Sequence, residues 1–485
     1  MDSQVLSEKL NQILGGVVHL LPEVLLLSGG LVTLVFELFA KDAWKPKTIT
    51  SIIFIAITFI SCFSVMPVGL IFEGALISDG LSFIFQAIFL FTFMFALIFP
   101  KQKWELRKMG EYHFLLFSLV LGAFIMVKSR NLLVFYLALE LISISSYILT
   151  SLGFSKKGFE AGIKYLLFGA LSSGVMLYGM SLLYGLSGSL DVAVILGASD
   201  FTELHLIALF LMMAGILFKL SVVPMHIWAP DVYQAAPVSV VALFSVVPKL
   251  AVLVFLFRSV VFIPDPSFQG SVGLILSCLA IASMFLGNLG AIWQTNAKRM
   301  MAYSSIAHAG FLIIGAIISN QFGLQSIIFY SVVYALMNMG TFYFVAVMER
   351  NGLFEIKDYS GIGRTYPVLA VCLVVFMISL TGLPPTGGFS AKFLLFSALW
   401  SLYETSQDNF LFWLFMFGLL NTVIALFYYL KIPYVGIFKT KNKQPELNVT
   451  AMDKIVLVLF AILILALFFK ADFLFDLTNK YNFAF

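Results

Sequence analysis

The sequence predicts an all-α polytopic membrane protein with about fourteen transmembrane helices. Three observations lead to this fold class. Of the 485 residues, 61% are hydrophobic and only 11% are charged, whereas a soluble domain is roughly half apolar and about a quarter charged. The apolar residues fall into runs long enough to cross a bilayer, and the basic residues gather in alternate loops between those runs. A water-soluble core cannot bury so much apolar surface.

A helix needs about 20 mostly apolar residues to cross the hydrocarbon core of a bilayer. The predicted spans lie near 16–39, 48–67, 80–99, 112–128, 131–153, 161–186, 203–229, 237–261, 270–293, 299–319, 323–349, 366–402, 410–436 and 453–474. The seventh and twelfth contain prolines, so we expect both of these helices to be broken. Residues 1–14 are polar and amphipathic, which is not the pattern of a cleavable signal peptide.

The loops between these spans differ in their basic residues. Loops that follow odd-numbered spans hold seventeen lysines and arginines, and loops that follow even-numbered spans hold three, namely Lys128, Arg130 and Arg258. Basic loops stay on the cytoplasmic side of a membrane. We therefore predict a multi-pass protein of the bacterial plasma membrane with both termini on the outer side.

The chain offers no ligand set for a redox centre. Cys62, Cys278 and Cys372 each lie alone in an apolar run, and the sequence has no CxxC pair and no His/Cys cluster. Metal and iron–sulfur sites need such groups of ligands. We predict that this chain binds no metal and no cofactor. Its net charge of +4 gives no indication of a nucleic-acid partner.

Two parts of the chain resemble each other at an offset of 160 to 167 residues. Lys219–Pro224 (KLSVVP) is similar to Ser379–Pro384 (SLTGLP), and Tyr136–Glu140 falls opposite Tyr303–Ala307. Each repeat then contains five helices, and an odd number inverts the second copy relative to the first. The predicted organisation is a three-helix segment over 1–111, a first five-helix repeat over 112–262, a second, inverted repeat over 263–437 and a C-terminal helix within 438–485.

Ionisable residues lie inside the predicted spans, where each costs about 3 kcal/mol to insert. They are Glu140, Lys164, Lys219, Lys249, Lys392, His226 and His308. Burial disfavours the charged ammonium, so a deep lysine releases its proton readily. A carboxylate at about 4 Å stabilises the charge by about 4 kcal/mol at an effective dielectric of about 20. Moving or neutralising Glu140 would therefore switch a buried lysine between holding and releasing a proton.

Three deep lysines, Lys219, Lys249 and Lys392, each lie within eight residues of a proline. A proline leaves the carbonyl four residues before it without its helical donor. The carbonyls concerned are those of Leu220, Phe244, Leu380 and Thr381, which precede Pro224, Pro248, Pro384 and Pro385. Irregular backbone at this depth is tolerated only inside protein or beside a hydrated cavity. We therefore predict a wet site next to each deep lysine.

Structural roles stay open for several of these residues. A single membrane lysine can form a structural ion pair or reach the interface, above all Lys164 near a helix end. His226 and His308 can be packed, hydrogen-bonded histidines. Glu23 and Glu37 in the first span lie outside the repeats, and we expect them to serve packing or to contact a neighbouring subunit.

Several motifs resemble those of the antiporter-like subunits of respiratory complex I. They are 218–234 (FKLSVVPMHIWAPDVYQ), Glu140–Ser143 (ELIS), Gly287–Leu289 (GNL), Gln294–Asn296 (QTN), Lys298–Arg299, Tyr303–His308 (YSSIAH) and Leu383–Phe389 (LPPTGGF). The resemblance covers nearly the whole chain. Two features resemble one branch of this family. The twelfth span carries a lysine, Lys392, and the fourteenth span is not followed by the long lateral helix that another branch has.

The resemblance implies a role for each deep residue. Glu140 and Lys219 match the key ion pair of the family, Lys249 its central connecting lysine, and Lys392 the residue of the outward half-channel. Lys164 matches a secondary lysine near the glutamate.

The resemblance also places His308 on the polar axis between the halves. It implies as partners the other membrane subunits, among them a neighbouring antiporter-like subunit and small membrane subunits, together with lipid. NADH, flavin, iron–sulfur clusters and quinone are expected in partner subunits. The predicted function is proton translocation, coupled to electron transfer that takes place elsewhere in the complex.

Three alternatives are compatible with part of this pattern. A subunit of a multi-subunit Na⁺/H⁺ antiporter shares the same motifs. A scaffold could carry a polar row that moves nothing. A stand-alone solute transporter is not supported, because no substrate-sized group of polar residues is present beyond those suited to protons.

Overall fold

The computed structural model describes residues 15–39, 44–64, 69–100, 109–197, 201–439 and 446–480, and these are almost entirely helical. Thirteen helices in these ranges are long and apolar enough to cross a membrane, which confirms the predicted fold class. They are α2 (Leu21–Phe39), α3 (Trp44–Ser64), α4 (Gly80–Ile98), α5 (Met109–Lys128), α6 (Leu132–Ser151), α7 (Lys156–Ser187), α9 (Glu203–Leu220), α11 (Val238–Val261), α12 (Pro266–Ile292), α13 (Ala297–Ile317), α14 (Gln321–Arg350), α18 (Asn409–Phe438) and α19 (Ala451–Phe469).

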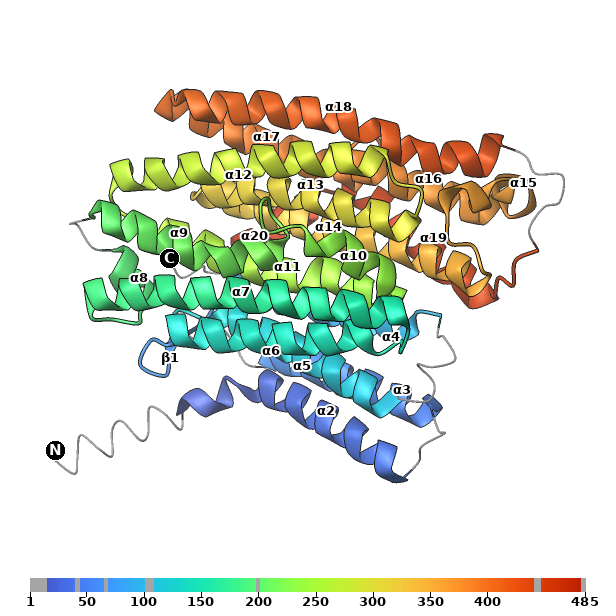
Figure 1. The fold of residues 1–485 in the computed structure, drawn as a ribbon, viewed down its shortest axis with the longest axis horizontal. Helices are drawn as coiled ribbons and strands as arrows, with labels where there is room; N and C mark the ends of the chain where they lie inside the picture. The colour runs from blue at the N-terminus through green and yellow to red at the C-terminus, as the bar shows by residue number, and fades with distance from the viewer. Residues whose placement is uncertain are drawn as a thin grey trace.

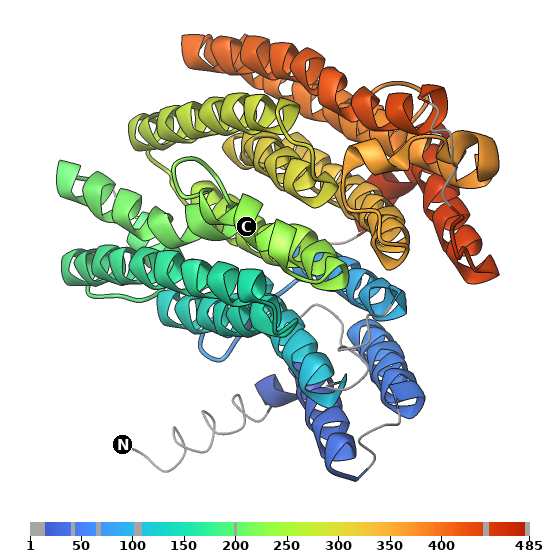
Figure 2. The same cartoon turned by 45° about the vertical axis from the view of Figure 1, so that its right-hand side comes forward.

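The long helices lie roughly parallel, with α2 at one edge of the bundle and α18 at the opposite edge (Figures 1 and 2). The helix α11 lies in the middle, packed against α4, α5, α9, α13 and α14. All of its residues from Val238 to Val260 are buried. A helix that is apolar all round belongs in the core of a membrane bundle, so α11 is the axis around which the other helices pack.

Two of the predicted spans are broken, as expected. The seventh consists of α9 and the short α10 (Trp228–Ala235), and the twelfth of α16 (Pro367–Thr381) and α17 (Gly387–Ser406). Each break begins at a residue with left-handed backbone, Ser221 at φ 59° and Gly382 at φ 87°. At Gly382 a Cβ atom would lie 2.6 Å from Cδ of Lys392, so both the backbone angle and the close approach of the lysine require glycine there.

The helix α11 continues through Pro248 without a break. A proline in a helix removes one hydrogen bond and one donor. The neighbours that enclose α11 hold it as a single helix despite that loss.

The short elements were not predicted from the sequence. The strands β1 (Gly69–Ile71) and β2 (Leu76–Ser78) form an antiparallel hairpin at the end of the bundle where α5 joins α6. Ser129 forms a bridge with Leu76, and the amide of Arg130 donates to the carbonyl of Ala75. We call this the hairpin end. The connections α6–α7, α12–α13 and α18–α19 lie at the other end, which we call the basic end.

The remaining short helices are α8 (Val192–Leu196), the 3₁₀ helix η1 (Ile356–Tyr359), α15 (Ile362–Thr365) and α20 (Asp472–Lys480). All four lie in connections or after the last span. The predicted N-terminal amphipathic stretch, residues 1–14, lies outside the described residues.

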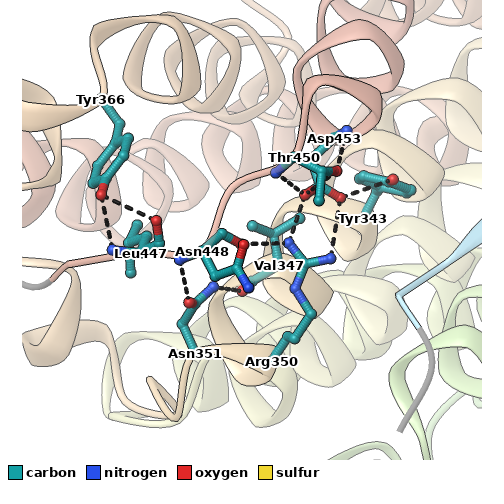
Figure 3. Close-up of polar contacts among 9 residues, drawn as sticks. All are labelled: Tyr343, Val347, Arg350, Asn351, Tyr366, Leu447, Asn448, Thr450 and Asp453. Carbon is teal, nitrogen blue, oxygen red and sulfur yellow. Dashed lines mark hydrogen bonds and ion pairs between the residues drawn. The ribbon is translucent and has the colours of Figure 1, made fainter.

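A polar clamp at the basic end fixes the start of α19 to the end of α14 (Figure 3). Arg350 binds Asp453 at 2.5 Å and donates to the carbonyl of Asn448 at 2.6 Å. Asp453 also accepts from the backbone amide of Thr450, in a capping box that begins α19. The side chain of Asp453 is only 3% exposed, so its charge depends on these partners.

We expect Arg350→Gln to lower the free energy of unfolding by about 1–3 kcal/mol, because it leaves a buried carboxylate without its charged donor. Thermal unfolding of the purified protein in detergent measures this change. Lys357→Gln is the matched control: it removes an exposed ion pair with Glu355, which is worth little. Equal effects of the two substitutions would contradict the role given to the clamp.

Candidate functional site

The deep lysines predicted from the sequence are buried in the structure. Lys219, Lys249 and Lys392 are 2%, 0% and 5% exposed, and we call these three the lysine row. His308 is equally buried, whereas Glu140 is partly exposed. Each lysine of the row lies on a different helix, α9, α11 and α17, and each has a different kind of partner.

Lys219 lies in the last turn of α9, directly before the break, in an aromatic pocket. Its ammonium is 5.5 Å from the ring centre of Tyr147 and 5.3 Å from that of Tyr165, and 3.5 Å from the Tyr165 hydroxyl. Tyr165 stacks on Trp228 at 4.1 Å, and the Trp228 indole donates to the carbonyl of Phe218. The aromatic faces stabilise a cation at this place. Trp228 thereby holds one wall of the pocket.

The expected ion pair between Glu140 and Lys219 is not formed. The Glu140 carboxylate instead accepts a hydrogen bond of 2.5 Å from the Ser173 hydroxyl on α7, and no ion pair within 4.0 Å joins it to Lys219. The Lys219 ammonium lies in the tyrosine pocket, and the Glu140 carboxylate is bound by Ser173. Their electrostatic coupling is therefore weaker than that of a direct contact.

Lys164, expected near Glu140, belongs to a different cluster at the basic end. It pairs with Glu160 at 2.8 Å and with Asp231 at 3.2 Å, and its side chain is 44% exposed. Asp231 on α10 also binds Arg299 on α13 at 2.6 Å. Asp231 is thus an anion bound by two cations.

This cluster borders a cavity of about 200 Å³. Lys164, Asp231 and Gln234 line it, together with Glu160 and Lys157. The cavity lies beside α10, on the basic-end side of the break that follows Lys219.

Lys249 lies at the centre of the bundle and binds α13. Its ammonium donates to the Ser305 hydroxyl at 2.5 Å and to the Ser305 carbonyl at 3.0 Å. The same hydroxyl lies 3.2 Å from that of Tyr233 and 3.4 Å from that of Tyr334. The Tyr334 hydroxyl in turn donates to the carbonyl of Ser245, one turn before Lys249. Lys249 therefore begins a chain of buried hydroxyl groups.

His308 lies one turn further along α13 and has two hydroxyl partners. Nδ1 is 2.7 Å from the hydroxyl of Tyr330, and Nε2 is 3.1 Å from that of Tyr429. Tyr429 also forms a short hydrogen bond with the hydroxyl of Ser304. A neutral imidazole donates from one ring nitrogen and accepts at the other, so His308 can pass a proton between its two tyrosines.

Lys392 binds the carbonyls that the break between α16 and α17 sets free. Its ammonium donates to Thr381 at 2.8 Å and to Leu380 at 3.5 Å, and it lies 4.6 Å from the ring centre of Phe311. The prolines were predicted to free these two carbonyls. The lysine itself satisfies both of them.

A second cavity, of about 530 Å³, begins at Lys392 and follows α17 and α18 to Glu404. Glu404 lies three turns after Lys392, near the hairpin end of α17. A cavity thus lies beside Lys392, and the predicted hydration of this place stays a prediction. Five of its twelve lining residues are aromatic, among them Phe389 and Trp400.

Several residues of the site were not predicted from the sequence. Asp231 and Ser305 stand inside two of the motifs quoted above, but nothing in their spacing indicated a contact with Lys164 or Lys249. The tyrosines carried no signal, because buried tyrosines are common fillers of apolar cores. In the part of the chain that the structure describes, no group of three or more His, Cys, Asp or Glu could hold a metal ion.

Comparisons with known proteins agree with this architecture. A family described as "NADH:quinone oxidoreductase/Mrp antiporter, TM" matches residues 129–425. NADH-quinone oxidoreductase subunit N 2 of Chloroherpeton thalassium is 36% identical over 423 residues, which are 82% of this chain and 80% of that protein. Subunit N of Chlorobium chlorochromatii is 37% identical over 431 residues, 84% of this chain and 82% of that protein.

A solved structure is similar over nearly the whole chain. A chain of respiratory complex I from Thermus thermophilus, solved with bound aureothin, superposes with a TM-score of 0.78 at 26% identity, covering 93% of this chain and 98% of that one. The branch predicted from Lys392 is that of subunit N, and the relatives confirm it. They also confirm the predicted role of an antiporter-like, proton-translocating subunit. The chain belongs to the family of transmembrane subunits of NADH:quinone oxidoreductases and Mrp antiporters.

Proposed function

We propose that this chain moves protons across the membrane through the lysine row, as a subunit of NADH:quinone oxidoreductase. One observation carries the proposal. Lys219, Lys249 and Lys392 are all buried, and among the described residues none of them has a carboxylate within ion-pair distance. A membrane lysine commonly pairs with a charged group or with backbone carbonyls, whereas among the described residues the Lys219 ammonium meets only the Tyr165 hydroxyl and aromatic rings. A buried ammonium without a counter-ion is instead ready to exchange its proton.

The proposed route begins at the basic end, at the cavity beside Lys164 and Asp231. A proton passes the break after α9 to Lys219 and then reaches Lys249. The hydroxyl groups around Ser305 and His308 carry it along α13 toward the second half of the bundle.

The last steps run from Lys392 into the cavity that leads to Glu404 at the hairpin end. Each gap between neighbouring hydrogen-bonded groups is bridged by water, which irregular backbone at this depth admits. Hydroxyl, imidazole and amine groups suit this task because each of them can both give and take a proton.

Glu140 acts at the edge of the route. It is partly exposed on α6, and its carboxylate is held by Ser173 on the neighbouring helix. A charge change in an adjacent subunit would move or neutralise this carboxylate. The stabilisation of a cation at Lys219 would change with it, through space rather than through a direct contact.

The proposed setting is the plasma membrane of a bacterium, with the basic end in the cytoplasm and the hairpin end outside. The excess of basic residues in alternate loops supports this orientation. We also propose that 112–262 and 263–437 are inverted repeats. The left-handed residues Ser221 and Gly382 at the two breaks support that relation.

NADH oxidation and quinone reduction take place in partner subunits that carry flavin, iron–sulfur clusters and quinone. The partners are a neighbouring antiporter-like subunit, small membrane subunits and lipid. The chain itself contributes the proton path.

A subunit of an Mrp-type Na⁺/H⁺ antiporter is the second candidate, because the matching family includes both kinds of protein. Proton movement that depends on NADH and not on Na⁺ supports the first candidate. Transport that depends on Na⁺ and continues without NADH supports the second.

We expect Lys219→Ala to reduce proton pumping and NADH:quinone activity about tenfold or more, since a well-placed proton-transfer group contributes at least about a hundredfold to such steps. Both are measured in native membranes that contain the assembled complex. Lys219→Arg should be equally impaired, because it keeps the charge but cannot release a proton.

Lys470→Ala, at an exposed position after α19, is the control and should behave as the unaltered protein. Wild-type pumping in both Lys219 variants would exclude the proposed route. Activity of Lys219→Arg alone would mean that only the positive charge matters, as in a structural role.

The orientation is tested with single cysteines at two exposed positions, Lys357→Cys at the basic end and Gln407→Cys at the hairpin end. In cells with a permeable outer membrane, an impermeant maleimide should label Gln407→Cys and leave Lys357→Cys unlabelled. Inside-out vesicles should give the opposite result. The parent chain corrects for labelling of Cys278, which is exposed. Reversed labelling would place the basic end outside.

A further inference from the structure

Two buried ion pairs lie at the hairpin end, away from the lysine row. One joins Glu23 on α2 to Lys128 on α5 at 2.6 Å, and the other joins Asp79 to Arg258 on α11 at 2.7 Å. All four side chains are at most 6% exposed. Glu23 was expected to serve packing or to contact another subunit, but its partner is within this chain.

The charges suit the helix ends on which they lie. Glu23 is in the first turn of α2, and Asp79 is the N-cap of α4, where it accepts from the amide of Ser82 at 2.9 Å. Lys128 and Arg258 are in the last turns of α5 and α11. Acidic groups are stabilised at helix N-termini and basic groups at C-termini, so each member of the two pairs lies at the helix end that suits its sign.

Each pair has an unused hydrogen-bonding capacity. The Lys128 ammonium donates to Glu23 and to the carbonyl of His19 at 3.2 Å, which accounts for two of its three N–H donors. Asp79 uses Oδ1 for Arg258 and Ser82. Its Oδ2 is buried and has no hydrogen-bond partner in the described part of the chain.

A small cavity of about 10 Å³ lies between the two pairs. Its polar lining residues are Asp79, Lys128, Gln86, Ser78 and Ser82. Gln86 belongs to the same cluster, because its amide donates to Glu23 at 3.0 Å. The pairs therefore face one polar space rather than two separate ones.

We infer that this cavity binds one water molecule, which accepts from Lys128, donates to Asp79 and joins the two ion pairs into a single network. A volume of about 10 Å³ is close to the smallest that holds a water, and the lining offers the two to four polar partners that a buried water needs. A cavity of about 10 Å³ has room for one water molecule and for nothing larger.

The network links the N-terminal helices to the centre of the bundle. It connects α2 and α4, which belong to the predicted three-helix segment, with α5 and with α11, the helix that carries Lys249. The hairpin end of α11 is thus anchored to α4 by a buried ion pair and, through the water, to α2 and α5. This anchor is independent of the proposed proton route.

The test has two parts. The first is a cryo-EM map of the unaltered complex at a resolution that shows ordered water. We expect density in the cavity within hydrogen-bond distance of Lys128 Nζ and Asp79 Oδ2. This part needs no variant and so does not depend on whether a substituted chain folds.

The second part is a double-mutant cycle with Lys128→Met and Asp79→Asn, in which the midpoint of thermal unfolding is measured in the solubilised complex. Residues that share a bridging partner are coupled, whereas distant residues act additively. The double variant should therefore lose clearly less than the sum of the two single losses.

Glu37→Gln is the matched control for the cycle. Glu37 pairs with Lys47 at 2.7 Å at the other end of α2, and its effect should add to that of Asp79→Asn. An empty cavity in the map overturns the inference, and so does additivity of Lys128→Met with Asp79→Asn.

Discussion

A buried lysine in this bundle must find its hydrogen-bond partners within the protein, because hydrocarbon offers none. The three lysines of the row meet this requirement in three different ways. Lys219 lies among aromatic rings, Lys249 binds a serine of the next helix, and Lys392 binds backbone carbonyls. No carboxylate is used in any of them. Each site therefore holds a cation without fixing it, which is the property that a proton path requires.

The broken helices follow from the same constraint. At α16–α17 the break supplies acceptors directly, since the freed carbonyls point to the lysine on the next segment. At α11 no break is needed, because Ser305 from α13 reaches Lys249 across the helix contact. In a helix that is enclosed on all sides, a buried lysine can find hydrogen-bond acceptors on the neighbouring helices. In a helix nearer the edge of the bundle, the acceptors come from the helix's own backbone, where a break frees carbonyl groups.

Much of this arrangement could be predicted from the sequence, and the missing part has a common cause. Hydropathy predicted the membrane spans, the prolines predicted the breaks in the seventh and twelfth spans, and the charged residues inside apolar runs predicted the lysine row. The direct pairing of Glu140 with Lys219 was wrong, and the pairing of Lys164 with Asp231 was missed, because both depend on which faces of neighbouring helices meet. Ser305, Tyr334 and Tyr429 were missed for the same reason. Their role arises only from contacts between helices distant in sequence.

The backbone hydrogen bonds at Lys392 have a consequence for the speed of charge movement. An ammonium has three N–H donors, and the neutral amine that remains after proton loss still has two. The carbonyls of Leu380 and Thr381 can thus stay satisfied in both states. A carboxylic acid in that place would change from donor to acceptor and leave the broken backbone unpaired. The break between α16 and α17 therefore keeps its hydrogen bonds while charge passes. Proton exchange at Lys392 needs only local side-chain motion, which is faster than a rearrangement of helices.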